Sequence, residues 1–192
     1  KLFTHPHRRY IGIDPPAQEI SGMGLAAITY STTGRIFVLG LGDVSMDDTE
    51  TFEMNMIAGK FTTQVITQLM YLGKKASRIT VVPVVECNNN GFVSGGIVKS
   101  IRIHAIQCGC NYVMPFKRQW FNESINVDVG VLTDPKTKPG YITNMISLLV
   151  DNRIAVSSRC CTIGAIHRES YTTPSLAAVL ETMTSEMLQW KN

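Results

Sequence analysis

Two acidic side chains stand where runs of apolar residues end, and this position suggests chemistry with a divalent cation. Asp14 closes the run "RRYIGID" and precedes two prolines, which prevent a strand from continuing. Glu86 closes the run "ITVVPVV" and precedes a cysteine and three asparagines. Two carboxylates that meet repel each other unless they share a proton or a cation. Two Mg²⁺ or Mn²⁺ ions about 4 Å apart can activate a water and stabilise the leaving oxygen of a phosphodiester.

A structural role is the simpler interpretation for either acid taken alone. Asp14 would then end a turn before Pro15, and Glu86 would be a solvated charge at a strand end. The cation hypothesis therefore depends on whether the fold brings the two acids together.

The expected order of strands and helices does bring them together. Short strands are predicted at 10–14, 24–30 and 36–45, and a long helix follows that ends near Gly73. The apolar run 78–86 predicts a fourth strand that is covered on both faces. A right-handed crossover sets this strand beside the first and parallel to it. Ligands bind at the carboxyl ends of such strands in open α/β sheets.

The rest of the chain continues the α/β pattern. A fifth strand is predicted at 111–116, a short strand or edge at 153–158, and further helices at 97–108, 141–151 and 175–190. Pro83 predicts a bulge or a local gap in the fourth strand, because proline cannot donate to the ladder. We expect an α/β fold with a mixed five-stranded central sheet flanked by helices, in a single domain over residues 1–192.

Composition excludes several other classes of protein. The 192 residues are 44 % hydrophobic, which suffices for one core, and the formal charge of +3 permits an anionic partner without requiring one. The five cysteines form no CxxC pair, which disfavours a zinc site and favours a reducing compartment. No apolar run approaches the ~18–20 residues that a membrane span needs. In "GFVSGGIVK" the lysine does not directly follow the last glycine, as a phosphate-binding loop requires.

Three stretches together resemble one known family. "IGIDPPAQEISGMGLAAIT" resembles the opening hairpin of the nuclease domain of the viral terminase large subunit, which cuts and packages DNA in herpesviruses and tailed phages. In that family an apolar strand ends in Asp-Pro, and a pair of glycines starts the next strand. "VVPVVECNNNG" resembles the second motif, and "VGVLTDPKTKPGYITNMISLLVDNRIAV" resembles a later segment in which a threonine and then a lysine precede a helix. The order holds across nearly the whole chain, with herpesvirus-type terminases as the closer branch.

The resemblance implies an RNase H-like fold and metal-dependent cleavage of double-stranded viral DNA. Asp14 and Glu86 match the first two ligands of a site for two Mg²⁺ or Mn²⁺ ions, and the turn 88–90 would shape its edge. The chain would be the C-terminal-type nuclease domain of a larger subunit whose ATPase motor lies outside residues 1–192. Other terminase subunits and the portal would be its partners, with no membrane. The host nucleus is the implied location for a herpesvirus type and the host cytoplasm for a phage type.

The third carboxylate of the family has no counterpart in its usual place. The family has an Asp-Asp pair before an apolar helix, whereas Thr173, Pro174 and Ser175 precede "LAAVL" in this chain. Three explanations remain open. Glu169 supplies the third catalytic and metal-binding group from a shifted place, or the acid belongs to residues missing near 171–175, or the domain is impaired.

Four basic residues are candidates for binding DNA, with a solvated loop as the competing interpretation. They are Lys117, Arg118, Lys136 and Lys138. Near a metal site they would contact phosphates independently of sequence. Two alternative functions also remain open. One is another RNase H-like nuclease, such as a junction resolvase or a transposase core, and the other is a non-catalytic DNA-binding or assembly module on the same fold.

Overall fold

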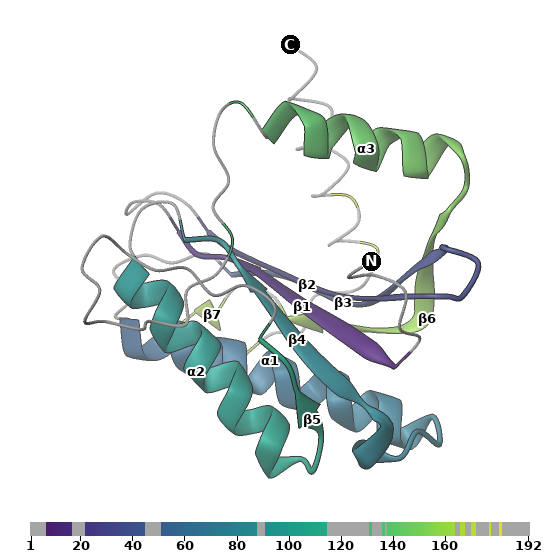
Figure 1. The fold of residues 1–192 in the computed structure, drawn as a ribbon. Helices are drawn as coiled ribbons and strands as arrows, with labels where there is room; N and C mark the ends of the chain where they lie inside the picture. Colours follow the sequence, from purple (N-terminus) through teal and green to yellow (C-terminus); the bar gives the residue numbers. More distant parts are fainter. Residues whose placement is uncertain are drawn as a thin grey trace.

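A mixed six-stranded sheet forms the centre of the molecule (Figure 1). The computed structural model describes residues 7–16, 22–44, 51–87, 91–114, 131, 136, 138–163, 166–167, 170–171, 177 and 181. The strands lie in the order β5-β4-β1-β2-β3-β6. Their bounds are β1 (Arg8–Asp14), β2 (Met23–Tyr30), β3 (Ile36–Val44), β4 (Thr80–Val85), β5 (Asn111–Tyr112) and β6 (Ile154–Ile163). A separate antiparallel pair consists of β7 (Ile166–His167) and β8 (Ser170–Tyr171).

The expectation of five strands was wrong, because β6 joins the sheet. The segment 153–158 was expected to be a short strand or edge, but β6 has ten residues and pairs in parallel with β3. The partners lie far apart in sequence, as in the pair Ile36 and Ile154. A local apolar pattern does not predict such a pairing, because the pairing depends on the path of the chain between the two strands.

The crossover that was expected between the third and fourth strands is confirmed. β1 and β2 pair antiparallel, as do β2 and β3, and helix α1 (Thr51–Tyr71) then leads to β4. β4 lies beside β1 and parallel to it, with Tyr10 opposite Val82 and Ile13 opposite Val85. The carboxyl ends of these two strands therefore lie side by side.

Pro83 lies within β4 at a gap in the ladder, as predicted. The backbone N–H groups of odd-numbered residues in β4 point away from β1. This follows from the alternation at its end, where the N–H of Glu86 donates to Ile13 of β1 and the N–H of Cys87 donates to Val131. Among the described residues, β5 pairs on that outer side only as far as Val81, and the partner beyond the proline is Val131. The position of Pro83 falls between these two partners, so its missing N–H leaves no ladder bond broken.

Two helices cover one face of the sheet and build the main core with it (Figure 1). These are α1 and α2 (Gly91–Gln107), and their apolar side chains pack on β1, β2 and β4. The ring of Phe61 lies so close to Gly40 that a Cβ there would be 2.9 Å from it. Glycine at this position thus allows α1 to pack directly on β3.

Helix α2 begins six residues earlier than predicted. The glycines of "FVSGG" suggested a turn that leads into a helix at residue 97, but they lie within the helix. Gly96 faces Asn55 of α1, and a Cβ would be 2.8 Å from its Oδ1. The contact between the helices explains the glycine, and it becomes visible only when the helices are packed.

The described helices α1, α2 and α3 end in the same way, although their sequences differ. Gly73, Gly109 and Asn152 follow α1, α2 and α3 (Lys138–Val150) with φ of 80°, 76° and 51°. After α1 the N–H of Lys74 donates to the carbonyl of Leu69 at 3.0 Å, and equivalent bonds follow the other two helices. This is the Schellman motif, which satisfies carbonyls at the helix end. A 3₁₀ turn, η1 (Ala76–Arg78), then leads from α1 towards β4.

Helix α3 differs from α1 and α2, since it has no buried residue.

Among the described residues no helix is both long and apolar enough to cross a membrane. Several predictions fall outside the described residues: those on 88–90, on 115–116 and on most of 175–190, where only Ala177 and Glu181 are described, as helical and exposed.

Candidate active site

The ends of β1 and β4 place two carboxylates next to each other. Asp14 is the last residue of β1, and Glu86 directly follows β4. The backbone N–H of Glu86 donates to the carbonyl of Ile13 at 2.9 Å, which continues the parallel ladder to this point. The adjacency expected from the sequence is confirmed, and the two prolines after Asp14 end the strand there.

The two carboxyl groups are in direct contact. Desolvation of the carboxyl group, a side-chain hydrogen bond with Glu86 and the charge of Glu86 together raise the pKa of Asp14 to about 6. By its accessible area Asp14 is exposed, whereas Glu86 is half-buried. Two carboxylates in contact disfavour each other's charge unless a proton or a cation lies between them. The site therefore concentrates oxygen ligands and negative charge at one point of the sheet edge.

The backbone around Glu86 is held on both sides. Ser94, which is fully buried in the first turns of α2, donates its hydroxyl to the carbonyl of Glu86 at 2.8 Å. On the outer side the N–H of Cys87 donates to the carbonyl of Val131 at 2.9 Å. We did not single out Ser94 from the sequence, where it is one hydroxyl among several in a glycine-rich stretch. These bonds fix the direction in which the Glu86 side chain leaves the sheet.

A third acid lies on the same edge of the sheet but does not join the pair. In the sheet register Asp14 is opposite Gly24, and Gly24 is opposite Asp43 of β3. The Asp43 carboxylate lies over Gly22, since its Oδ1 is 2.7 Å from where a Cβ of that glycine would be. Within the described part of the chain no group of three or more His, Cys, Asp or Glu side chains is placed to hold a metal.

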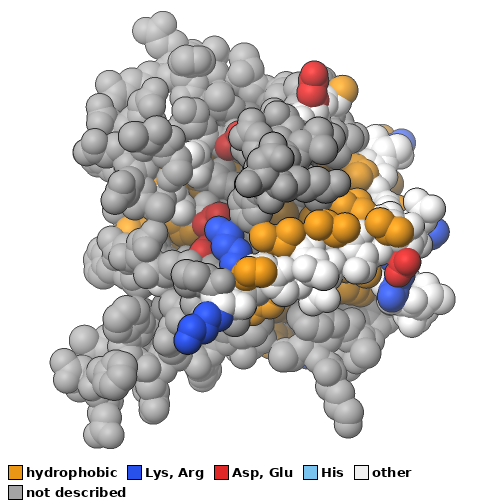
Figure 2. All heavy atoms as spheres, turned by 90° about the horizontal axis from the view of Figure 1, so that it is seen from above, with side chains coloured by type: hydrophobic (Ala, Val, Ile, Leu, Met, Phe, Trp, Pro, Cys, Tyr) orange, Lys and Arg blue, Asp and Glu red, His pale blue; other side chains and the backbone are white. Residues whose placement is uncertain are grey.

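Basic residues at the start of α3 flank the carboxylates. The positive charge of Lys138 lowers the pKa of Asp14 and so opposes part of the effect of Glu86. Lys136 is exposed two residues earlier. Figure 2 shows Lys or Arg side chains next to Asp or Glu side chains at one end of the helix that lies on top. Lys117, Arg118 and Glu169 lie outside the described residues, and their roles stay predictions.

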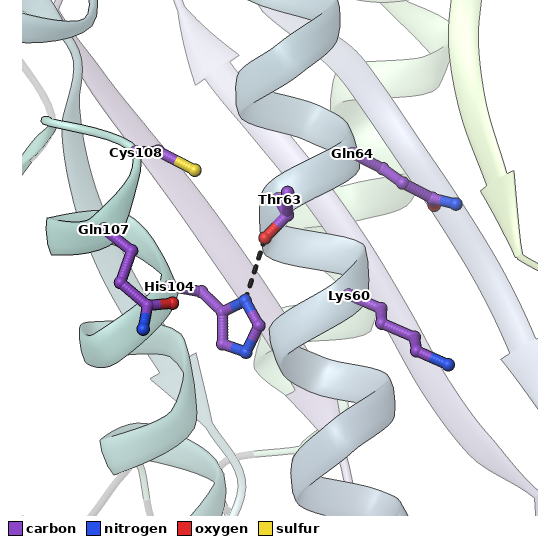
Figure 3. A pocket seen from close by; sticks show the side chains of 6 residues that line it. All are labelled: Lys60, Thr63, Gln64, His104, Gln107 and Cys108. Atoms are coloured by element: carbon purple, nitrogen blue, oxygen red, sulfur yellow. Dashed lines mark hydrogen bonds between the residues drawn. The ribbon is translucent and has the colours of Figure 1, made fainter.

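A shallow depression of about 460 Å³ lies elsewhere, between α1 and α2 (Figure 3). It is lined by Lys60, Thr63, Gln64, His104, Gln107 and Cys108. His104 Nδ1 and Thr63 Oγ1 are 2.9 Å apart and link the two helices. Lys60 and Gln64 point away from His104 in this view, so the polar groups do not converge on a ligand. The depression contains no residue of the carboxylate edge.

The sheet order and its connections define an RNase H-like fold. Among solved structures, the human cytomegalovirus terminase nuclease domain is similar over 94 % of this chain and 75 % of its own, with a TM-score of 0.71 and 18 % identity in its Mn-soaked, inhibitor-bound form. A further structure of the human cytomegalovirus terminase nuclease domain gives a TM-score of 0.70 at 19 % identity, over 93 % of this chain and 76 % of its own.

The resemblance to terminase nuclease domains is therefore confirmed at the level of the fold. Identities this low show the fold alone. No family model matches the chain, and no curated protein matches it in sequence. Any activity of the chain must accordingly be argued from its own residues.

Proposed function

We propose that this chain is the nuclease domain of a viral terminase large subunit. It would be an endonuclease that depends on Mg²⁺ or Mn²⁺ and cuts double-stranded DNA during genome packaging. The observation that supports the proposal most directly is the contact between Asp14 and Glu86 at the carboxyl ends of two parallel central strands. Two acids in such contact disfavour each other's charge and gain from a cation between them.

The donor set at this edge fits a hard divalent cation. Asp14 and Glu86 offer carboxylate oxygens, the ligands that Mg²⁺ and Mn²⁺ favour, and the thiol of the neighbouring Cys87 is buried. Asp14 and Glu86 would hold the ions, with Glu169 as the proposed third ligand. Bound ions would supply an activated water and stabilise the charge on the leaving oxygen.

The chain's own residues would position the DNA. Lys138 carries positive charge near Asp14, and the exposed Lys136 precedes it by two residues, where a phosphodiester backbone would otherwise be repelled. Lys117 and Arg118 are proposed to add further phosphate contacts. Such contacts fix the strand at the site and carry no sequence information, which agrees with cutting DNA of arbitrary sequence.

Nicking of a supercoiled plasmid tests the metal site. With Mn²⁺ or Mg²⁺ present, we expect the chain to nick the plasmid and expect Asp14→Asn and Glu86→Gln to abolish nicking, a loss of about 10³-fold or more. Each change removes a charged oxygen ligand and keeps the shape of the side chain.

Asp43→Asn provides a matched control for this test. It removes an acid from the same sheet edge but outside the contact pair, so nicking should remain. Equal activity of the Asp14 or Glu86 variant and the parent would show that the site has been assigned wrongly.

A non-catalytic DNA-binding or assembly module is the second candidate. It is favoured by the lack of a third acid near the pair among the described residues. Titration calorimetry separates the two, because a nuclease must bind Mn²⁺ at millimolar concentration or below. A four-way junction cut in preference to linear plasmid would instead indicate a junction resolvase.

The biological setting belongs to the same proposal. The ATPase motor would lie outside residues 1–192, and the other terminase subunits and the portal would be the protein partners. The host nucleus would be the site of action for a herpesvirus-type enzyme and the host cytoplasm for a phage type. Co-purification of the chain with terminase subunits from infected cells would test this setting.

A further inference from the structure

Helix α3 exposes an unexplained row of large apolar side chains. The row contains Tyr141, Met145, Ile146, Leu149 and Val150, which are 39–74 % exposed. Figure 2 shows hydrophobic side chains that lead away from the basic side chains at the end of this helix. Apolar side chains gathered along one surface helix mark a binding surface more often than single exposed ones do.

The row begins at the carboxylate edge. Figure 2 shows Lys or Arg side chains next to Asp or Glu side chains at one end of this helix, and Lys138, the first residue of α3, lies within electrostatic reach of Asp14. Tyr141 lies three residues further along the helix and Met145 four beyond that. Side chains at these spacings are neighbours on one face. A ligand held by Lys138 would therefore meet the Tyr141 ring next, about 4.5 Å further along the helix axis.

The charges along α3 suit a polyanion. From Lys138 to Val150 the helix carries no acidic residue, and Lys136 adds a second positive charge before it. The first acid, Asp151, stands at the far end of the helix. A DNA strand that approaches the carboxylates is thus attracted at the near end of α3 and meets no acidic side chain of α3 along the row.

We propose that Tyr141 stacks on an unpaired base of the strand whose phosphate lies at the carboxylate pair. The inference rests on the proposed function and specifies its substrate: DNA whose strands are separated next to the cut, rather than intact duplex. An exposed ring beside basic side chains is the arrangement by which proteins hold single strands, since every base has a face that can stack. The half-exposed Met145 extends the apolar surface under the next base.

Equilibrium binding without divalent metal tests this inference. The probe is a fluorescently labelled single strand of twelve nucleotides, compared with a blunt duplex of the same sequence. Tyr141→Ala should weaken single-strand binding by about five- to a hundred-fold, the range typical of one stacked base. Tyr141→Phe should restore it, because the ring is retained, and neither change should alter duplex affinity.

Tyr71→Ala is the matched control. Tyr71 is 77 % exposed at the end of α1, where the ring lies under the guanidinium of Arg159. Helix α1 starts near the carboxyl ends of β1 and β4 and runs towards the other end of the sheet (Figure 1). Tyr71, its last residue, therefore lies at the end of the sheet away from the carboxylates. Its removal should leave single-strand binding unchanged.

Several outcomes would overturn the inference. Unchanged single-strand affinity in Tyr141→Ala, an equal loss for duplex, or no binding of single strands at all would each do so. If Tyr141→Ala instead changed only the sedimentation of the chain, the row would be a protein interface. The proposed nuclease function can fail separately. If the chain binds single strands through Tyr141 but never nicks DNA, the stacking inference stands and the nuclease assignment is wrong.

Discussion

At the scale of the residue, the contact between Asp14 and Glu86 lowers the stability of the metal-free protein at neutral pH. Burial and then the contact with Glu86 raise the pKa of Asp14 to about 6, so that folding at neutral pH brings negative charges together. Lys138 relieves part of this repulsion. The fold nonetheless holds the pair in place through the ladder bond from Glu86 to Ile13 and the bond from Ser94. A site that is strained without its ligand and relieved with it is typical of cation binding.

The pH dependence of stability follows from this pair. Because folding raises the Asp14 pKa from its usual value of about 3.9, the folded state binds more protons between about pH 4 and 6. The stabilisation is complete below pH 4 and is lost as the pH rises through 6. We expect the free energy of unfolding of the metal-free chain to fall by on the order of 1 kcal/mol, a value reduced for the solvent exposure of Asp14.

Urea unfolding in a chelator at pH 4.5 and 7 would measure this loss. Asp14→Asn should flatten the pH dependence and leave the variant more stable than the parent at pH 7. A parent whose stability rises between these pH values, with the Asn variant following it, would contradict the assignment. Added Mn²⁺ should stabilise the parent more than the variant.

At the scale of the element, the helix ends and strand ends decide where side chains can act. β1 ends at a pair of prolines and β4 ends where Ser94 of α2 bonds to the backbone, so both acids leave the sheet at defined points. The helices end in left-handed residues that turn the chain sharply back towards the sheet. Short connections of this kind keep the elements in register and limit movement of the site.

The cap of α1 allows a clean test of backbone conformation. Gly73 has φ of 80°, and no atom lies within 4 Å of where its Cβ would be, so Gly73→Ala introduces strain without any clash. We expect a loss of about 1 kcal/mol in the free energy of unfolding. Gly140→Ala in α3 also meets no atom within 4 Å, but no left-handed conformation is needed there. It should stabilise the chain by up to about 1 kcal/mol. Urea denaturation of both variants would check the opposite signs.

At the scale of the whole molecule, the sheet gathers charge of both signs at one end. The carboxylates lie at the carboxyl ends of β1 and β4, and α3 adds Lys138 beside them. The apolar face of α3 begins at the same end. Lys74 and Lys75, which are exposed, lie at the opposite end of the sheet, where α1 finishes.

The salt dependence of DNA binding tests this arrangement. If Lys136, Lys138, Lys117 and Arg118 each neutralise one phosphate, their replacement by alanine should flatten the plot of log affinity against log salt by ~0.9 per lost contact. Affinity should fall evenly for DNA of different sequences. Alanine at Lys74 and Lys75 should leave the slope unchanged. An unchanged slope in the fourfold variant would show that these residues do not contact phosphates and are solvated loop residues.

Local sequence patterns were enough to predict the central part of the fold and the acid pair. Apolar runs that end in Asp14 and Glu86 mark two strand ends, and the preferred hand of the crossover sets these strands in parallel. Pro83 even predicted a gap in the ladder, because the missing N–H is a local property of the residue. These features depend on nearby residues and on general rules of chain connection.

Only the tertiary structure decided the features that depend on distant partners. β6 becomes a ten-residue strand by pairing with β3, and Gly96 of α2 lies where α1 brings Asn55 against it. The exposed face of α3 is likewise invisible in its sequence, since an apolar stripe predicts burial until the packing is known. Each of these outcomes depends on contacts between segments far apart in the chain, and a local pattern carries no information about which segment arrives there.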